Sequence, residues 1–268
     1  MSEFDRRTHP CRAFIGDYAP RAICCSTLLK CQLIAALVTL AAAAASIPAL
    51  SQAPPAPATR FVVVLDAAHG GDDPGAILKE PSGASQPEKS ITLALSVHLR
   101  SLLAARGISV VTTRESDTAV DPGRRAEIAN RANAQACLSL HATQSGTGIH
   151  LFSSSLAPAE PTRLIPWKTA QAAWVTRSLA FAGVLNSALQ HTGMTVTLGR
   201  TALPAIDSMA CPAVAVEIAP ETGPETTSAQ TQPVSPSDAG YQARVAQALA
   251  TAILEWRSNA SATEVAQP

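Results

Sequence analysis

The sequence predicts an α/β fold, a three-layer sandwich in which helices cover both faces of a twisted, mostly parallel sheet. Residues 61–65 form a continuous apolar run rich in valine, which is typical of a strand buried on both faces. Strands and helices then alternate up to residue 141, and successive right-handed βαβ units build a parallel sheet. We expect one domain over residues 61–257, followed by a disordered tail at 258–268.

The composition argues against a nucleic-acid-binding protein. The chain has 268 residues, a formal net charge of zero and only 4% aromatic residues. Proteins that bind nucleic acids usually carry a basic patch or stripe, and this sequence has none. We therefore expect no nucleic-acid partner.

Residues 1–53 are arranged like a secretory signal. Basic side chains come first, an apolar stretch follows at 33–50, and residues 51–53 (Ser-Gln-Ala) offer a small-x-small cleavage site. The apolar stretch is short for a transmembrane span and contains Pro48. A Pro/Ala-rich linker at 54–60 leads into the domain. We expect export to the periplasm or cell envelope. Two alternatives to a cleaved signal remain: an uncleaved signal anchor, which would be the only contact with the membrane, and a start codon placed too early.

Only two of the six cysteines lie beyond the expected signal segment, namely Cys137 and Cys211. Each stands at the start of an apolar strand, where a free cysteine behaves as a small buried hydrophobe. We expect two buried free thiols. A disulfide between them is the alternative in an oxidising compartment.

Capping residues and apolar spacing predict the helices. Residues 88–106 carry apolar side chains at three- and four-residue steps, and Gly107 follows in the usual C′ position. Asp121 is a favourable N-cap for a helix over 121–133. The remaining elements, in chain order, are a loop at 78–87, strands at 108–113 and 137–141, a strand near an edge of the sheet at 148–153, a loop at 156–166, a helix at 174–192, a mixed connection at 197–209, a buried strand at 212–218, a mobile loop at 220–238 and a helix at 241–257.

Histidine and carboxylate side chains occur where several of these elements begin or end. His69 and His141 follow buried strands, and Glu88 stands in the first turn of a helix. Two imidazoles and one carboxylate, with a fourth position open to water, form a catalytic zinc arrangement. No short motif such as H-E-x-x-H supports this set, so ordinary loop histidines are the alternative. Glu217 lies in a buried strand, where a carboxylate is rare unless it is paired or functional.

Six segments, in this order, resemble the motifs of one family: Asp66–Gly75, Glu88-Lys89, Thr113-Arg114 with Asp117, Arg125–Asn130, Ser139–Ala142 and Pro212–Glu217. Residues 60–257 thereby resemble the zinc-dependent N-acetylmuramoyl-L-alanine amidases of bacterial cell walls, with their type 3 catalytic domain. The resemblance implies that His69, Glu88 and His141 bind Zn²⁺ and that Glu217 is the catalytic carboxylate. It also implies peptidoglycan as the partner, cut between N-acetylmuramic acid and L-alanine.

Three positions depart from the family pattern. Ala68 replaces a glycine before the first metal histidine, and Thr143 replaces an asparagine after His-Ala. Ala219-Pro220-Glu221 changes the segment beside the catalytic carboxylate, where Glu221 is either a second acidic group of the cleft or a solvated loop residue. Two alternative functions follow: a related exported zinc peptidase or amidase with another substrate, and a non-catalytic wall-binding homologue.

Overall fold

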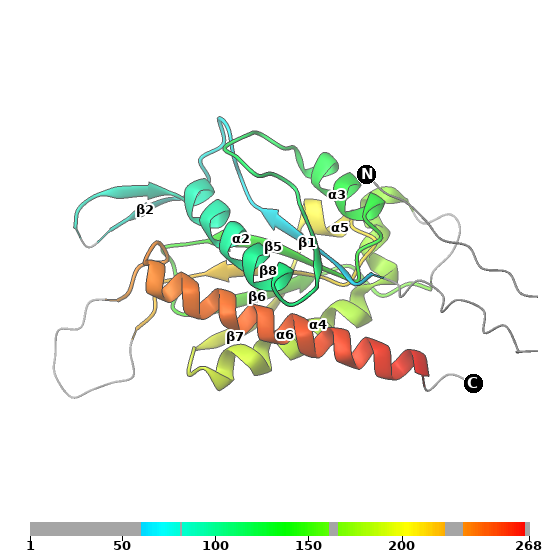
Figure 1. The fold of residues 1–268 in the computed structure, drawn as a ribbon. Coiled ribbons are helices and arrows are strands. Elements are labelled where there is room, and N and C mark those ends of the chain that lie inside the picture. Colours follow the sequence, from blue (N-terminus) through cyan, green and yellow to red (C-terminus); the bar gives the residue numbers. More distant parts are fainter. Residues whose placement is uncertain (1–59, 81, 161–165, 223–232, 266–268) are drawn as a thin grey trace, which may run out of the picture. The chain divides into compact units, whose positions relative to one another are not determined.

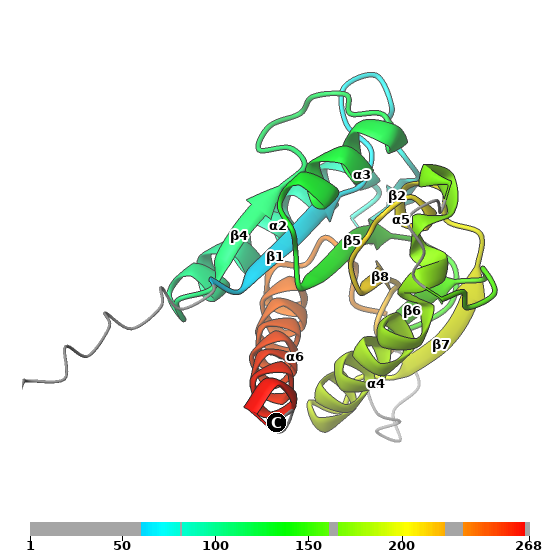
Figure 2. The same cartoon turned by 90° about the vertical axis from the view of Figure 1, so that its right-hand side faces the viewer.

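The computed structural model describes residues 60–80, 82–160, 166–222 and 233–265. Their main feature is a six-stranded sheet with the order β4-β1-β5-β8-β6-β7 (Figures 1 and 2). All neighbouring strands are parallel except β6 and β8. This confirms the prediction of a mostly parallel sheet. The strands are β1 (Val62–Ala67), β4 (Ser109–Thr112), β5 (Ala136–Ala142), β6 (Ile149–Ser154), β7 (Val196–Thr201) and β8 (Ala213–Ile218).

Helices cover both faces of the sheet, as Figure 2 shows. The larger core lies between one face and three long helices, α2 (Glu88–Ala104), α4 (Val175–His191) and α6 (Ala239–Val265). The smaller core lies under α3 (Pro122–Arg131) and the short α5 (Pro204–Asp207). A 3-10 helix, η1 (Trp167–Ala173), packs against α5. The predicted three-layer sandwich is therefore confirmed. Alternate residues of the central strands, such as Cys137 of β5 and Ala215 of β8, belong to the smaller core.

The strand predicted near an edge of the sheet, at 148–153, is confirmed as β6, the neighbour of the edge strand β7. Two other stretches contain strands that we did not predict. Most of β7 is exposed, and Leu198 keeps 58% of its surface accessible. The alternation of apolar and polar residues in β7 ends after Leu198, at Gly199 and Arg200, and is too short to predict a strand. The expected loop at 78–87 contains a short hairpin of β2 (Ile77–Lys79) and β3 (Ser85–Pro87).

Helix α6 is longer than expected. It continues to Val265, so helix occupies residues 258–265 of the segment that we predicted to be a disordered tail. The predicted signal segment at 1–53 lies outside the described residues, as does nearly all of the linker at 54–60. In the described ranges, no helix is both long enough and apolar enough to cross a bilayer.

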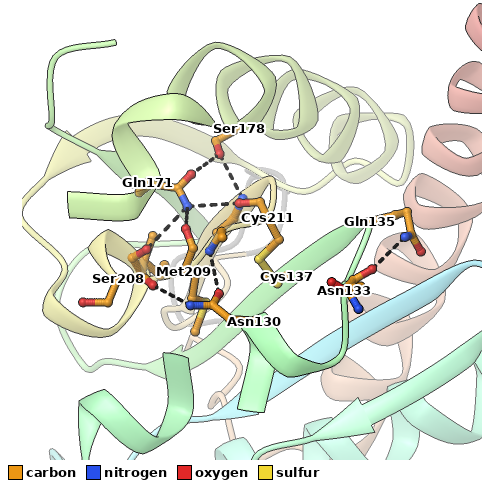
Figure 3. The surroundings of a disulfide bond; sticks show 12 residues. Asn130, Asn133, Gln135, Cys137, Gln171, Ser178, Ser208, Met209 and Cys211 are labelled. Atoms are coloured by element: carbon orange, nitrogen blue, oxygen red, sulfur yellow. Dashed lines mark hydrogen bonds between the residues drawn. A yellow bond between two sulfur atoms is a disulfide. The ribbon is translucent and has the colours of Figure 1, made fainter. Parts of the chain in front are cut away.

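The prediction of two free thiols was also wrong, because Cys137 and Cys211 form a disulfide (Figure 3). Cys137 lies in β5 opposite Ala213 of β8, so Cys211 arrives beside it just before β8 begins. Sequence could not show this proximity, because the two cysteines are 74 residues apart.

Side-chain amides also hold the segment that leads into β8. The buried Gln171 donates from Nε2 to the carbonyl oxygens of Met209 and Cys211 at 2.9 and 3.0 Å. Asn130 donates to the Ser208 carbonyl at 3.0 Å (Figure 3). Together with the disulfide, these bonds fix the start of the strand that carries Glu217.

Candidate metal and catalytic site

The structure brings three of the predicted site residues together at the carboxyl edge of the parallel strands. His69 follows β1, His141 lies near the end of β5, and Glu88 is the first residue of α2. One ligand atom of each lies within 4.8 Å of the other two. In the described part of the chain, no other set of three histidine, cysteine or acidic side chains converges in this way.

Glu88 lies at the centre of this cluster and uses both carboxylate oxygens. Oε1 accepts from the Ala142 amide at 3.1 Å and lies 3.0 Å from His141 Nδ1. Oε2 accepts from the Ala76 amide at 2.9 Å and lies 3.1 Å from His69 Nε2. Burial alone would raise the pKa of Glu88, but these hydrogen bonds outweigh it and hold the pKa well below its usual range. Glu88 is therefore ionised at neutral pH, as a metal ligand must be.

The remaining ring nitrogen of each histidine also has a partner. His69 Nδ1 lies 2.8 Å from an Asp73 carboxylate oxygen, and His141 Nε2 lies 3.3 Å from Ser139 Oγ. Ser139 in turn donates to the buried Asp66 at 2.8 Å. Such outer partners fix the orientation of metal-binding imidazoles and raise their basicity. The other ring nitrogens, His69 Nε2 and His141 Nδ1, therefore point at Glu88.

The loop after β1 needs glycine to make room for these groups. Gly75 has a φ of +66°, and a Cβ placed there would lie 2.6 Å from both Glu88 Oε2 and His69 Cδ2. His69 itself has a φ of +61°, an uncommon conformation for a residue with a side chain. Arg125 holds it by donating to the His69 carbonyl at 2.8 Å.

Several motif residues hold this loop in place and do not belong to the cluster of His69, Glu88 and His141. Arg114 donates to the carbonyls of Ala68 and Lys89 at 3.0 and 2.7 Å, which joins the loop to the first turn of α2. Lys89 donates from Nζ to the Gly71 carbonyl and to Asp117, both at 2.7 Å. These contacts fix the distance between His69 and Glu88.

Glu217 stands beside the cluster rather than in it. It is directly opposite His141 in the parallel pair of β5 and β8. Its Oε2 lies 2.9 Å from Nδ1 of His150, which sequence analysis missed. His150 is the second residue of β6, and in a fully parallel sheet the start of a strand lies at the edge opposite the site. Because β6 runs antiparallel to β8, its start lies at the same edge as Glu217. No signal in the sequence marks this reversal.

A cavity of about 220 Å³ adjoins the two histidines of this cluster. One wall is polar and includes His69, His141, Ser139 and Arg125. The opposite walls are apolar and come from the start of α3 and from α5: Val120, Pro122, Leu203, Pro204, Ala205 and Ile206. The arrangement suits a substrate that combines a polar group near His69 and His141 with small apolar groups beside it.

The structure accommodates the three departures from the family pattern. Ala68 has no positive φ, so its methyl group is tolerated where the family has glycine. Thr143 Oγ1 accepts from the Ser145 amide at 3.1 Å and thus closes a local turn. Glu221 forms an ion pair with Arg244 of α6, so it is a paired residue and not a second free acid of the cleft.

Comparison with known proteins places the chain in a family. The family model for N-acetylmuramoyl-L-alanine amidase (Amidase_3) matches residues 63–255. The chain belongs to this amidase family. The catalytic domain of the amidase CwlV from Bacillus (Paenibacillus) polymyxa var. colistinus has a similar structure. Its TM-score is 0.55 at 27% identity, over 74% of this chain and 98% of that one.

Two curated amidases illustrate the range of similarity. AmiA of Escherichia coli is 42% identical over 81 residues, which cover 30% of this chain and 27% of AmiA. An amidase of Mycobacterium tuberculosis is 28% identical over 176 residues, which cover 58% of this chain and 68% of the relative. The chain therefore matches only about a quarter of the length of AmiA but two thirds of the mycobacterial protein.

Proposed function

We propose that this amidase-family protein is a zinc hydrolase that cleaves the amide bond between N-acetylmuramic acid and L-alanine in peptidoglycan. The convergence of His69, Glu88 and His141 within 4.8 Å, with Glu217 on the adjacent strand, carries the proposal. Relatives of both kinds, curated and structural, bear the name N-acetylmuramoyl-L-alanine amidase. Peptidoglycan is accordingly the proposed partner.

The donor set fits zinc. Two imidazole nitrogens and one carboxylate oxygen are the protein ligands of many catalytic zinc sites, and both imidazoles here have the outer partners that such sites use. When bound, zinc would lower the pKa of a water molecule and polarise the scissile carbonyl. His69, Glu88 and His141 would hold the ion.

Glu217 is the proposed general base and acid. An amide nitrogen is a poor leaving group until it is protonated, so the reaction needs a group that takes a proton from water and returns it to nitrogen. The Glu217 side chain is 30% exposed, so water can reach its carboxylate while His150 holds one oxygen. In this proposal it carries the proton through both steps.

The disulfide supports the proposed location in the periplasm or cell envelope. Disulfides persist in oxidising compartments outside the cytoplasm, and the Cys137–Cys211 bond lies within the described domain. Peptidoglycan is found in the same compartment. We propose that residues 1–53 act as the export signal.

Digestion of purified sacculi tests the function. The protein with bound zinc should release stem peptides with a free L-alanine amino group, and Glu217→Gln should bind zinc equally well but release none. Release of amino acids while stems remain on the sugar would instead indicate a peptidase. Zinc-loaded wild-type protein that sediments with sacculi without releasing peptide would support the non-catalytic alternative, and an active Glu217→Gln variant would contradict the assigned role.

A further inference from the structure

We infer that His150 is a positioning residue that fixes the orientation of the Glu217 carboxylate. The inference rests on the proposed function, since it assigns a partner to the proposed general base. It concerns the outer side of Glu217, away from the β5 strand that carries His141. Neither the motifs nor the apolar periodicity of the sequence marks His150.

Sheet register places His150 next to Glu217. Glu217 of β8 is paired with His141 of β5 on one side and with His150 of β6 on the other. Residues that are directly opposite in neighbouring strands project from the same face. His141, Glu217 and His150 therefore form a row across three strands, with Glu217 in the middle.

The contact between His150 and Glu217 is a directed hydrogen bond. Nδ1 of His150 lies 2.9 Å from Glu217 Oε2. An ionised carboxylate has no hydrogen to donate, so Nδ1 carries the hydrogen in this pair. Oε2 is thereby occupied, and Oε1 is the oxygen left to exchange a proton with water and with the leaving nitrogen.

His150 is itself firmly held. Its side chain is only 14% exposed, and its ring makes an edge contact with Phe152, with centroids 6.3 Å apart. Gly146, at a φ of +80°, passes close to the far edge of the ring, and a Cβ there would lie 2.5 Å from His150 Cε1 and 2.7 Å from Nε2. A ring confined in this way can restrict a flexible glutamate side chain, which otherwise populates several rotamers.

The geometry distinguishes this role from metal binding. The converging set is limited, within the described residues, to His69, Glu88 and His141, and His150 is not part of it. Its Nδ1 is directed at Glu217 instead. Loss of His150 should therefore leave metal binding intact and change only the reaction step that depends on the orientation of Glu217.

Three substitutions test the inference in the zinc-loaded protein with muropeptide as substrate. His150→Leu removes the hydrogen-bond donor, and kcat should fall about 10- to 100-fold, as expected when a reacting group is misplaced. KM and zinc content should stay within about twofold, because neither depends on Glu217 orientation. His150→Asn carries an amide N–H near the place of Nδ1 and should recover most of kcat. His191→Leu, at the exposed end of α4, is the matched control and should behave as wild type.

Thermal stability separates positioning from packing. Because the inferred role is to orient Glu217 and not to hold the fold, His150→Leu should lose kcat while its melting temperature stays close to that of His191→Leu. An unchanged kcat in His150→Leu would refute the inference. It would also be refuted if His150→Leu and His150→Asn both lowered kcat, zinc content and melting temperature together. If the wild type hydrolyses no muropeptide, the proposed function fails; the carboxyl ¹³C resonance of Glu217 then tests the contact, and an identical shift in His150→Leu refutes it.

Discussion

Replacing Asp73 by alanine is expected to weaken zinc binding about tenfold, since outer partners of metal-binding histidines contribute about 10- to 100-fold to affinity. Asp73 lies 2.8 Å from His69 Nδ1, and this hydrogen bond lowers the pKa of the carboxyl group below its usual value. The Asp73 side chain is 64% exposed, so water weakens its electrostatic effect. The effect should therefore lie at the lower end of the range, or about 1.4 kcal/mol of binding free energy.

Competition with a chromogenic chelator measures this affinity directly. Asp72→Ala is the matched control, because it removes the same charge from the neighbouring, exposed position. The Asp73 variant should bind zinc more weakly than the Asp72 variant while both melt at similar temperatures. Equal affinities would show that only the net charge of the loop matters, and would refute the argument that Asp73 orients His69.

Three further predictions address the loop, the disulfide and the cavity. Gly75→Ala should abolish zinc binding, because the new Cβ would lie 2.6 Å from atoms of Glu88 and His69. Gly83→Ala is the control, since Gly83 also has a positive φ but has open space around it, and this variant should bind zinc normally. Equal zinc binding by the two variants would contradict the steric argument. Cys137→Ala/Cys211→Ala should lower the free energy of unfolding by about 4 kcal/mol for a loop of 74 residues, as measured by urea denaturation; a loss under about 1 kcal/mol would refute this value. Ala205→Phe should fill part of the 220 Å³ cavity and raise KM for muropeptide while zinc content stays unchanged. Ala202→Phe, at an exposed position, is the control and should leave KM unchanged. Similar KM values for the two variants would exclude the cavity from substrate binding.

Local patterns in the sequence predicted the elements that carry the site. The apolar run at 61–65 predicted β1, and the Asp121 N-cap, whose side chain accepts from the Arg124 amide at 3.0 Å, predicted the start of α3. Both signals are local, because burial of a strand and capping of a helix depend on neighbouring residues. The exposed strand β7 has no such signal and was missed for that reason.

The sequence by itself determined the α/β class, most helix boundaries and the identity of the residues that could hold a metal. Only the tertiary structure decided which of them meet. His69, Glu88 and His141 converge because β1 and β5 are adjacent and parallel. Cys137 meets Cys211, and Glu217 meets His150, because the structure pairs segments that are far apart in the chain. The reversed direction of β6 is the clearest case, since it brings the start of a strand to the edge where the other strands end. Strand order and direction depend on the packing of the whole sheet, and no short stretch of sequence encodes them.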